Sequence, residues 1–164
     1  MELVVVMALM AITGTFIVTV YIQQSRSSAE LMFRGQLQSI EEVFISDASR
    51  KVRSAFAVLA SNESYVGAPL TLAARTEDTI YVSLTAGTKV PLYAITSTGQ
   101  LREYSGGAWK PFISGNDTAR VATGSGFVLS ADRRELYINL RFWDMNKTDT
   151  VSLPTTGGFI RCRN

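Results

Sequence analysis

The sequence predicts an α+β protein in which one long N-terminal helix precedes a head of antiparallel β-strands. In the first part of the chain, an uncharged apolar run leads into a stretch where apolar residues recur every three or four positions, the spacing of one helix face. Beyond residue 61, apolar and polar residues alternate and β-branched and aromatic side chains become frequent, which is typical of strands.

The apolar run follows Glu2 and continues without a charge to residue 22. At about 1.5 Å per residue, a helix of this length matches the roughly 30 Å hydrocarbon core of a bilayer. We therefore expect residues 1–24 to form a single transmembrane helix. Gly14 is its weakest point, because glycine in a helix interior costs up to about 1 kcal/mol relative to alanine. Close contact between membrane helices through small residues is one explanation of this glycine.

The helix is expected to continue as an amphipathic segment over residues 25–61. Its apolar face is expected to pack against a sheet of the head through Phe44, Ala48, Val52, Ala55, Phe56 and Leu59. On the polar side, Asp47 is spaced to pair with Arg50 or Lys51 on the helix surface, which is worth a few tenths of a kcal/mol.

Residues 62–164 are expected to form the β-rich globular head. Its predicted strands cover residues 79–84, 90–95, 100–104, 108–112, 126–130, 135–143, 150–153 and 158–163. In residues 135–143, Leu136, Ile138, Leu140 and Phe142 fall on one face, which we predict to be buried.

The composition excludes several functions. The 164 residues include no histidine and one cysteine, Cys162, so a zinc site with imidazole or thiolate ligands and an intramolecular disulfide are both excluded. A net charge of +2 argues against nucleic acid as the main partner, since phosphate binding needs a concentrated basic surface. No nucleophile and base form a recognisable pair, so we expect no catalytic residues, no metal and no cofactor. Calcium binding by loop carbonyls remains open.

Three features resemble type IV pilins and the pseudopilins of type II secretion. These are Glu2 directly before an apolar span, a helix whose first half is apolar enough for lipid and whose second half is amphipathic, and a β-rich remainder. The stretch ISDASRKVRSA around Asp47 and the ending IRCRN are similar to minor subunits of the PilW and GspJ type. In this family a basic leader ending in glycine precedes the mature chain. Two interpretations stay open here: the sequence starts a few residues into the mature protein, or Met1 is a natural residue of the short apolar lead.

The resemblance implies a pilin-like fold and a structural, non-enzymatic subunit of the minor kind that forms or primes a type IV pilus or a type II secretion pseudopilus. The subunit would first reside in the inner membrane with a single span and its head in the periplasm, and would then join other pilin or pseudopilin subunits. Glu2 would pair with the N-terminal amine of a neighbouring subunit, and Gly14 would mark a segment that can lose helicity in the filament. The implied assembly residues are Glu2, Leu3, Val6, Leu9, Met10 and Gly14.

Two alternatives remain open. The head could be a pilus-tip module that binds a ligand or DNA through loops bearing Tyr104, Trp109 or Trp143. The chain could also be an ordinary single-pass, membrane-anchored domain. Arg26 and Arg34 follow the span, and the positive-inside rule applied to them alone would place the head in the cytoplasm, whereas a basic leader would reverse that orientation.

Overall fold

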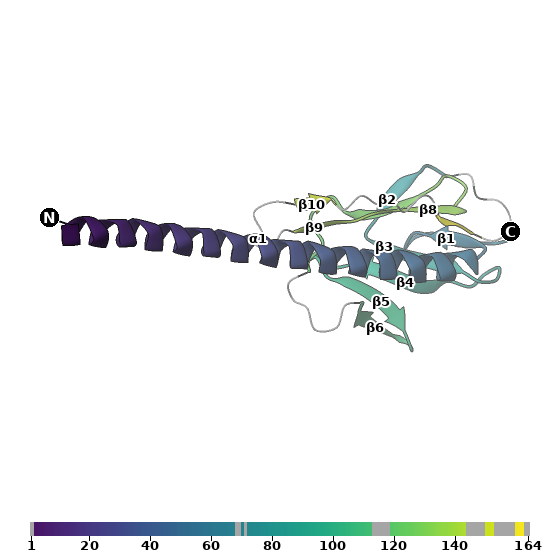
Figure 1. Ribbon diagram of the computed structural model, residues 1–164. Coiled ribbons are helices and arrows are strands. Elements are labelled where there is room, and N and C mark those ends of the chain that lie inside the picture. Colours follow the sequence, from purple (N-terminus) through teal and green to yellow (C-terminus); the bar gives the residue numbers. More distant parts are fainter. Residues whose placement is uncertain are drawn as a thin grey trace. The chain divides into compact units, whose positions relative to one another are not determined.

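The computed structural model describes residues 2–67, 70, 72–112, 119–143, 150–152 and 160–162. It has the predicted α+β composition: helix α1 (Glu2–Arg53) is followed by antiparallel strands (Figure 1). The chain divides into two compact units, residues 1–36 and 37–164, which are described separately below.

The first unit consists of the N-terminal part of α1, which is long and apolar enough to cross a membrane. Every side chain from residue 2 to residue 28 is exposed, and the helix runs unbroken through Gly14. The hydroxyls of Thr13, Thr15 and Thr19 each donate to the carbonyl four residues earlier, at 2.7–2.8 Å. These bonds satisfy the hydroxyls within the helix itself, as an apolar environment requires.

The helix ends at Arg53, so the expectation that it extends to residue 61 is wrong. The chain leaves it through a tight turn in which the Ala55 amide donates to the Val52 carbonyl at 3.0 Å, and then enters strand β1 (Ala57–Leu59). Residues 57–60 are all buried. A strand covered on both faces reads as a continuous apolar run, which periodicity alone cannot distinguish from a helix.

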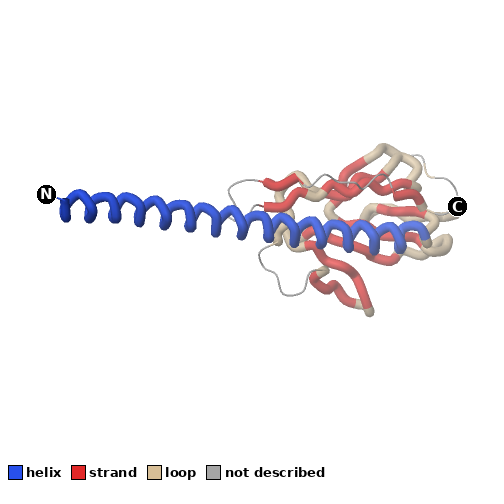
Figure 2. The backbone as a smooth tube through the Cα atoms, in the orientation of Figure 1, coloured by secondary structure: helices blue, strands red, loops and turns tan. Residues whose placement is uncertain are grey.

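Beyond α1, the tube view in Figure 2 shows that nearly all regular structure is strand. One sheet has the order β1-β3-β4-β5-β6. Its other members are β3 (Thr79–Ser83), β4 (Val90–Ile95), β5 (Leu101–Ser105) and β6 (Ala108–Pro111). These four strands confirm the meander predicted from residue 79 to residue 112. Gly106 and Gly107 join β5 to β6 with φ of 64° and 84°, the positive values that a tight hairpin turn needs.

The second sheet has the order β11-β8-β7-β2, and a separate pair joins β10 to β9. Their bounds are β2 (Arg75–Glu77), β7 (Gly126–Leu129), β8 (Glu135–Asn139), β9 (Arg141–Trp143), β10 (Thr150–Ser152) and β11 (Ile160–Arg161). The sequence did not predict β2. Parts of the strands expected at 150–153 and 158–163 lie outside the described residues.

The strand expected over residues 135–143 is divided at Leu140 into β8 and β9, which belong to different sheets. The predicted alternation is nevertheless confirmed, since Leu136, Ile138, Leu140 and Phe142 are all buried. The division arises because each half has its own partner: β8 pairs with β7 and β11, while β9 pairs with β10.

The core of the second unit joins the C-terminal part of α1 to both larger sheets. The ring of Phe44 lies 4.7 Å from that of Tyr93 on β4, 5.1 Å from that of Phe112 after β6, and 6.3 Å from that of Phe127 on β7, between centroids. A single helical side chain therefore contacts strands of two sheets, and this fixes where the helix face sits within the second unit.

A buried ion pair links two loops of the second unit. Arg133, in the connection between β7 and β8, is 1% exposed and donates through Nε and Nη2 to the Glu63 carboxylate at 2.8 and 2.6 Å. Its Nη1 donates to the carbonyls of Ala73 and Ser130. These bonds from Arg133 hold the pKa of Glu63 below its usual value. The turn predicted at residues 132–134 is present, but its central arginine anchors the loop instead of facing solvent.

Candidate functional site

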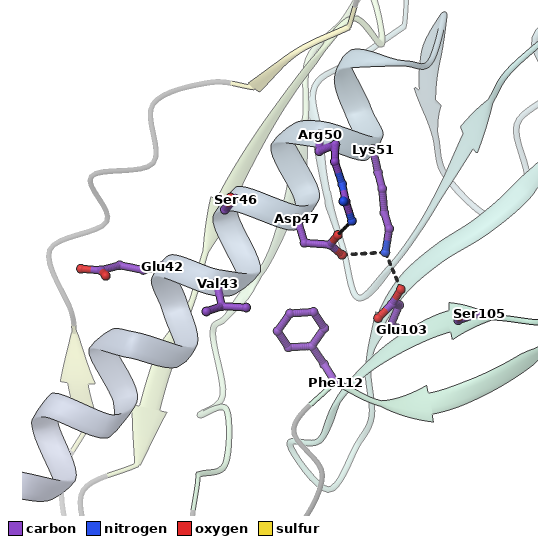
Figure 3. A pocket seen from close by; sticks show the side chains of 9 residues that line it. All are labelled: Glu42, Val43, Ser46, Asp47, Arg50, Lys51, Glu103, Ser105 and Phe112. Atoms are coloured by element: carbon purple, nitrogen blue, oxygen red, sulfur yellow. Dashed lines mark hydrogen bonds and ion pairs between the residues drawn. The ribbon is translucent and has the colours of Figure 1, made fainter.

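A hollow of the second unit lies between the C-terminal part of α1 and the β5–β6 hairpin (Figure 3). We call it the helix–hairpin groove. It has a volume of about 840 Å³. Its lining residues come from about three turns of helix, from β5 and from the residue after β6: Glu42, Val43, Ser46, Asp47, Arg50, Lys51, Glu103, Ser105 and Phe112.

A chain of polar contacts centred on Asp47 lines one wall of this groove. Asp47 Oδ1 accepts from Arg50 Nη2 and Asp47 Oδ2 accepts from Lys51 Nζ, both at 2.6 Å. The Tyr93 hydroxyl also donates to Oδ2, at 2.5 Å. Lys51 forms a second ion pair with Glu103 on β5, and its Nζ lies 5.2 Å from the centre of the Tyr93 ring. The helix-surface pair predicted from sequence is therefore confirmed, and it extends into the sheet.

The mutual contacts of this cluster stabilise its charged forms. Burial alone would raise the pKa of Asp47, but hydrogen bonds from Lys51, Tyr93 and Arg50 outweigh it and lower the pKa. Burial would likewise lower the pKa of Lys51, but the carboxylates of Asp47 and Glu103 raise it. Burial and the bond to Asp47 raise the pKa of the Tyr93 hydroxyl far above its usual range. All three groups keep their ordinary charge at neutral pH.

These contacts join the helix to the sheet, and their chemistry is that of a structural ion-pair network rather than of a catalytic site. Lys51 is protonated and held between two carboxylates, and Tyr93 keeps its proton, so neither is a base or nucleophile near pH 7. Among the described residues, no group of three or more histidine, cysteine, aspartate or glutamate side chains lies close enough together to hold a metal ion. Of the lining residues, Glu42, Val43, Ser46, Arg50 and Ser105 are exposed, and they offer a mostly polar binding surface.

The residues expected to assemble subunits lie on the exposed first unit of α1. Leu3, Val6, Leu9 and Met10 are each more than half exposed. A Cβ added at Gly14 would have no neighbour within 4 Å, so nothing within this chain requires a glycine there.

Of the residues expected to pack the helix on the head, Phe44, Ala48, Val52, Ala55 and Leu59 are buried, the last within β1. Phe56 is the exception at 46% exposed, so that prediction is wrong. The helix has already ended at this position, and the connection to β1 turns the ring outward, where it stacks on Tyr65 with the ring centres 6.4 Å apart.

The aromatic residues assigned to binding loops lie on strands instead. Tyr104 on β5 and Trp109 on β6 are directly opposite partners, and their rings make an edge contact at 5.4 Å. Trp143 ends β9, opposite Thr150. Cross-strand packing accounts for Tyr104 and Trp109. Because all three aromatic residues lie on strands, the tip-binding alternative loses the loop aromatics on which it depended.

Glu41 is a buried carboxylate on the packed face of the helix, and the sequence analysis did not predict its burial. It is 4% exposed, and its Oε1 has no hydrogen-bond partner among the residues that the structure describes. Burial, and secondarily the neighbouring Glu42, raise its pKa. The spacing contained a usable signal, because Glu41 lies four residues after Leu37 and three before Phe44, on the same helix face.

No protein-family model, curated protein or solved structure matches the chain. The described fold and surfaces therefore define the class of protein as an α+β chain whose long N-terminal helix has an exposed apolar part and a part packed within a β-rich head.

Proposed function

We propose that this protein is a structural, pilin-like subunit, most similar to minor subunits of a type IV pilus or a type II secretion pseudopilus. Its helix is held by the inner membrane, with the head in the periplasm, until the subunit enters a filament. There, its partners are other pilin or pseudopilin subunits.

The observation that carries the proposal is the exposure of the first unit. Residues 3–22 are uncharged, and none of their side chains is buried within the chain. About twenty apolar residues on all sides of a helix require either lipid or other apolar helices around them. Lipid satisfies this requirement before assembly, and neighbouring helices satisfy it afterwards.

The role of Glu2 is the part of the proposal specific to assembly. A carboxylate at the edge of an apolar span is tolerated near the headgroups, but within a bundle of helices it needs a cationic partner. An N-terminal amine of a neighbouring subunit provides that partner. An ordinary membrane anchor has no need for a carboxylate at this position.

Cross-linking in the membrane tests the proposal. Single cysteines at Val6 or Met10, in the full chain expressed in a bacterial inner membrane with its cognate filament machinery, should cross-link to neighbouring subunits. A cysteine at Met32, exposed on the helix beyond the span, is the control for random collision. Glu2→Ala and Glu2→Gln should both reduce the specific cross-link at equal membrane abundance.

Two results would contradict this function. Normal co-assembly of both Glu2 variants would remove the assembly role of the carboxylate. Stable membrane residence with no specific cross-link from either span position would leave the ordinary single-pass anchor as the better description.

A further inference from the structure

A second hollow of the head, of about 450 Å³, lies where α1 ends. We call it the arginine hollow, and its lining residues are Arg50, Arg53, Ser54, Arg161 and Cys162. Two arginines come from the last turn of the helix and the third comes from β11, near the other end of the chain. Three arginine residues thus line one hollow, and none of the described residues that line it is acidic.

These guanidinium groups retain donors for a ligand. Arg50 is bonded to Asp47 through Nη2, yet its side chain is 79% exposed. Arg161 Nε lies 3.8 Å from Glu135 Oε1, which is longer than a hydrogen bond, and its side chain is 66% exposed. Arg53 is exposed and forms no salt bridge with the residues that the structure describes. Each guanidinium carries five N–H donors, so most donors remain open.

The helix dipole explains only part of this arrangement. The negative C-terminal end of a helix attracts basic side chains, which accounts for Arg50 and Arg53 in the last turn. It does not account for an arginine contributed by a strand. The same dipole disfavours an anion, so any binding of an anion here must come from the three side chains acting together.

We propose that the arginine hollow binds a phosphate dianion, either free phosphate or a phosphomonoester. Guanidinium forks match phosphate oxygens in pairs, and three or more acceptor oxygens on one centre can engage forks that approach from different directions. A carboxylate has two oxygens in one plane and a single charge, so it matches three forks from different directions less well than a phosphate dianion does. This site belongs to the head alone and does not depend on whether the chain assembles into a filament.

Calorimetric titration of the full chain in neutral maltoside micelles with inorganic phosphate tests the site. Phosphate should bind, and Arg53→Gln and Arg161→Gln should each weaken it by about tenfold, as expected for loss of a charged hydrogen-bond donor. Arg141→Gln is the matched control, because Arg141 is an exposed strand arginine that does not line the hollow. It should leave the affinity unchanged, and circular dichroism should show the same fold for all three variants.

Further ligands distinguish the sources of the phosphate group. Glycerol 3-phosphate that binds more tightly than inorganic phosphate would identify a monoester, and the reverse order would identify free phosphate. Dimethyl phosphate and acetate, each with a single charge, should bind at least about tenfold more weakly. Equal binding of acetate, or unchanged phosphate affinity in Arg161→Gln, would overturn the proposal.

Discussion

Phe16 and Phe44 belong to the same helix but have opposite surroundings. Phe16 is 69% exposed within the first unit, whereas Phe44 is fully buried and contacts aromatic rings from both larger sheets. The contrast extends along the helix: residues 2–28 are exposed on all sides, whereas residues 37–53 bury one face within the head. The same apolar side chain therefore stabilises the fold in one part of the helix, and in the other is available to lipid or to another subunit.

The largest effect expected from this contrast is on head stability. Phe44→Ala should lower the free energy of unfolding by about 3–5 kcal/mol, because it removes a buried ring and leaves a cavity. Phe16→Ala should change it by less than about 0.5 kcal/mol, as is usual for exposed positions. Chemical denaturation of the full chain in micelles, followed by tryptophan fluorescence, measures both. Similar losses of unfolding free energy in the two variants would show that the two parts of the helix do not differ in their contribution to head stability.

The next largest effect should be on membrane insertion, when a charge is placed in the first or in the second unit of the helix. Leu9→Lys should disfavour insertion by about 2.5–3.5 kcal/mol, the cost of a charged residue near the centre of a span. Val43→Lys, at an exposed position of the second unit, should leave insertion unchanged. Alkaline extraction of membranes separates inserted from peripheral protein. A loss of insertion in Val43→Lys that equals the loss in Leu9→Lys would contradict the assignment of residues 3–22 as the span.

Asp47 provides a smaller and pH-dependent effect in the packed part of the helix. Asp47→Asn should destabilise the head by about 1.5–3 kcal/mol at pH 7, because it weakens hydrogen bonds to a charged group. The pKa of Asp47 is lowered from its ordinary 3.8, so its contribution is complete above about pH 4 and is lost as pH falls through the lower, folded-state pKa. Denaturation of wild type and variant should therefore converge in acid. A difference that persists at low pH would exclude the ionised carboxylate as its cause.

Glu41 should change the stability of the head with pH in the opposite direction from Asp47. Because its pKa is raised from 4.5, the folded state favours the protonated form, and stability is lost as pH rises above that value. Glu41→Gln should therefore stabilise the head at pH 7 by about 1 kcal/mol, the lower end of the cost of an unsatisfied buried polar group. The gain should shrink below pH 4.5. Destabilisation at pH 7 would mean that the Glu41 carboxylate has a favourable partner.

The smallest effect concerns the helix itself at Gly14. Gly14→Ala should favour the helix by less than about 1 kcal/mol, and the added Cβ meets nothing within this chain. Membrane insertion should be unchanged, while hydrogen exchange at residues 12–19 should slow. If a local loss of helicity is needed for assembly, the same variant should assemble less efficiently. Faster exchange in the variant would exclude a stabilising effect on the helix.

The α+β class, the first meander and the buried face of residues 135–143 could be predicted, because each depends on local periodicity. The end of the helix could not, because the buried run in β1 has no period that separates strand from helix. The Glu63–Arg133 pair and the contact of Lys51 with Glu103 were also beyond prediction. Their partners are 70 and 52 residues apart, and only the sheet topology brings them together.

The helix–hairpin groove and the arginine hollow also differ in whether the sequence predicts them. The pair between Asp47 and Arg50 or Lys51 follows from helix spacing and was predicted. The arginine hollow combines the end of the helix with β11, and nothing in the local sequence of Arg161 indicates that Arg53 lines the same hollow. Sites assembled from distant segments become visible only once the topology is known.

Cys162 gives the protein a practical property. It is the only cysteine, it is 5% exposed, and burial raises the pKa of its thiol to about 12. Thiol reagents act on the thiolate, so the folded wild-type chain should react only very slowly with maleimides. A cysteine introduced anywhere on the surface would then carry the only spectroscopic label, and distances between labelled copies could be measured without removing the native residue.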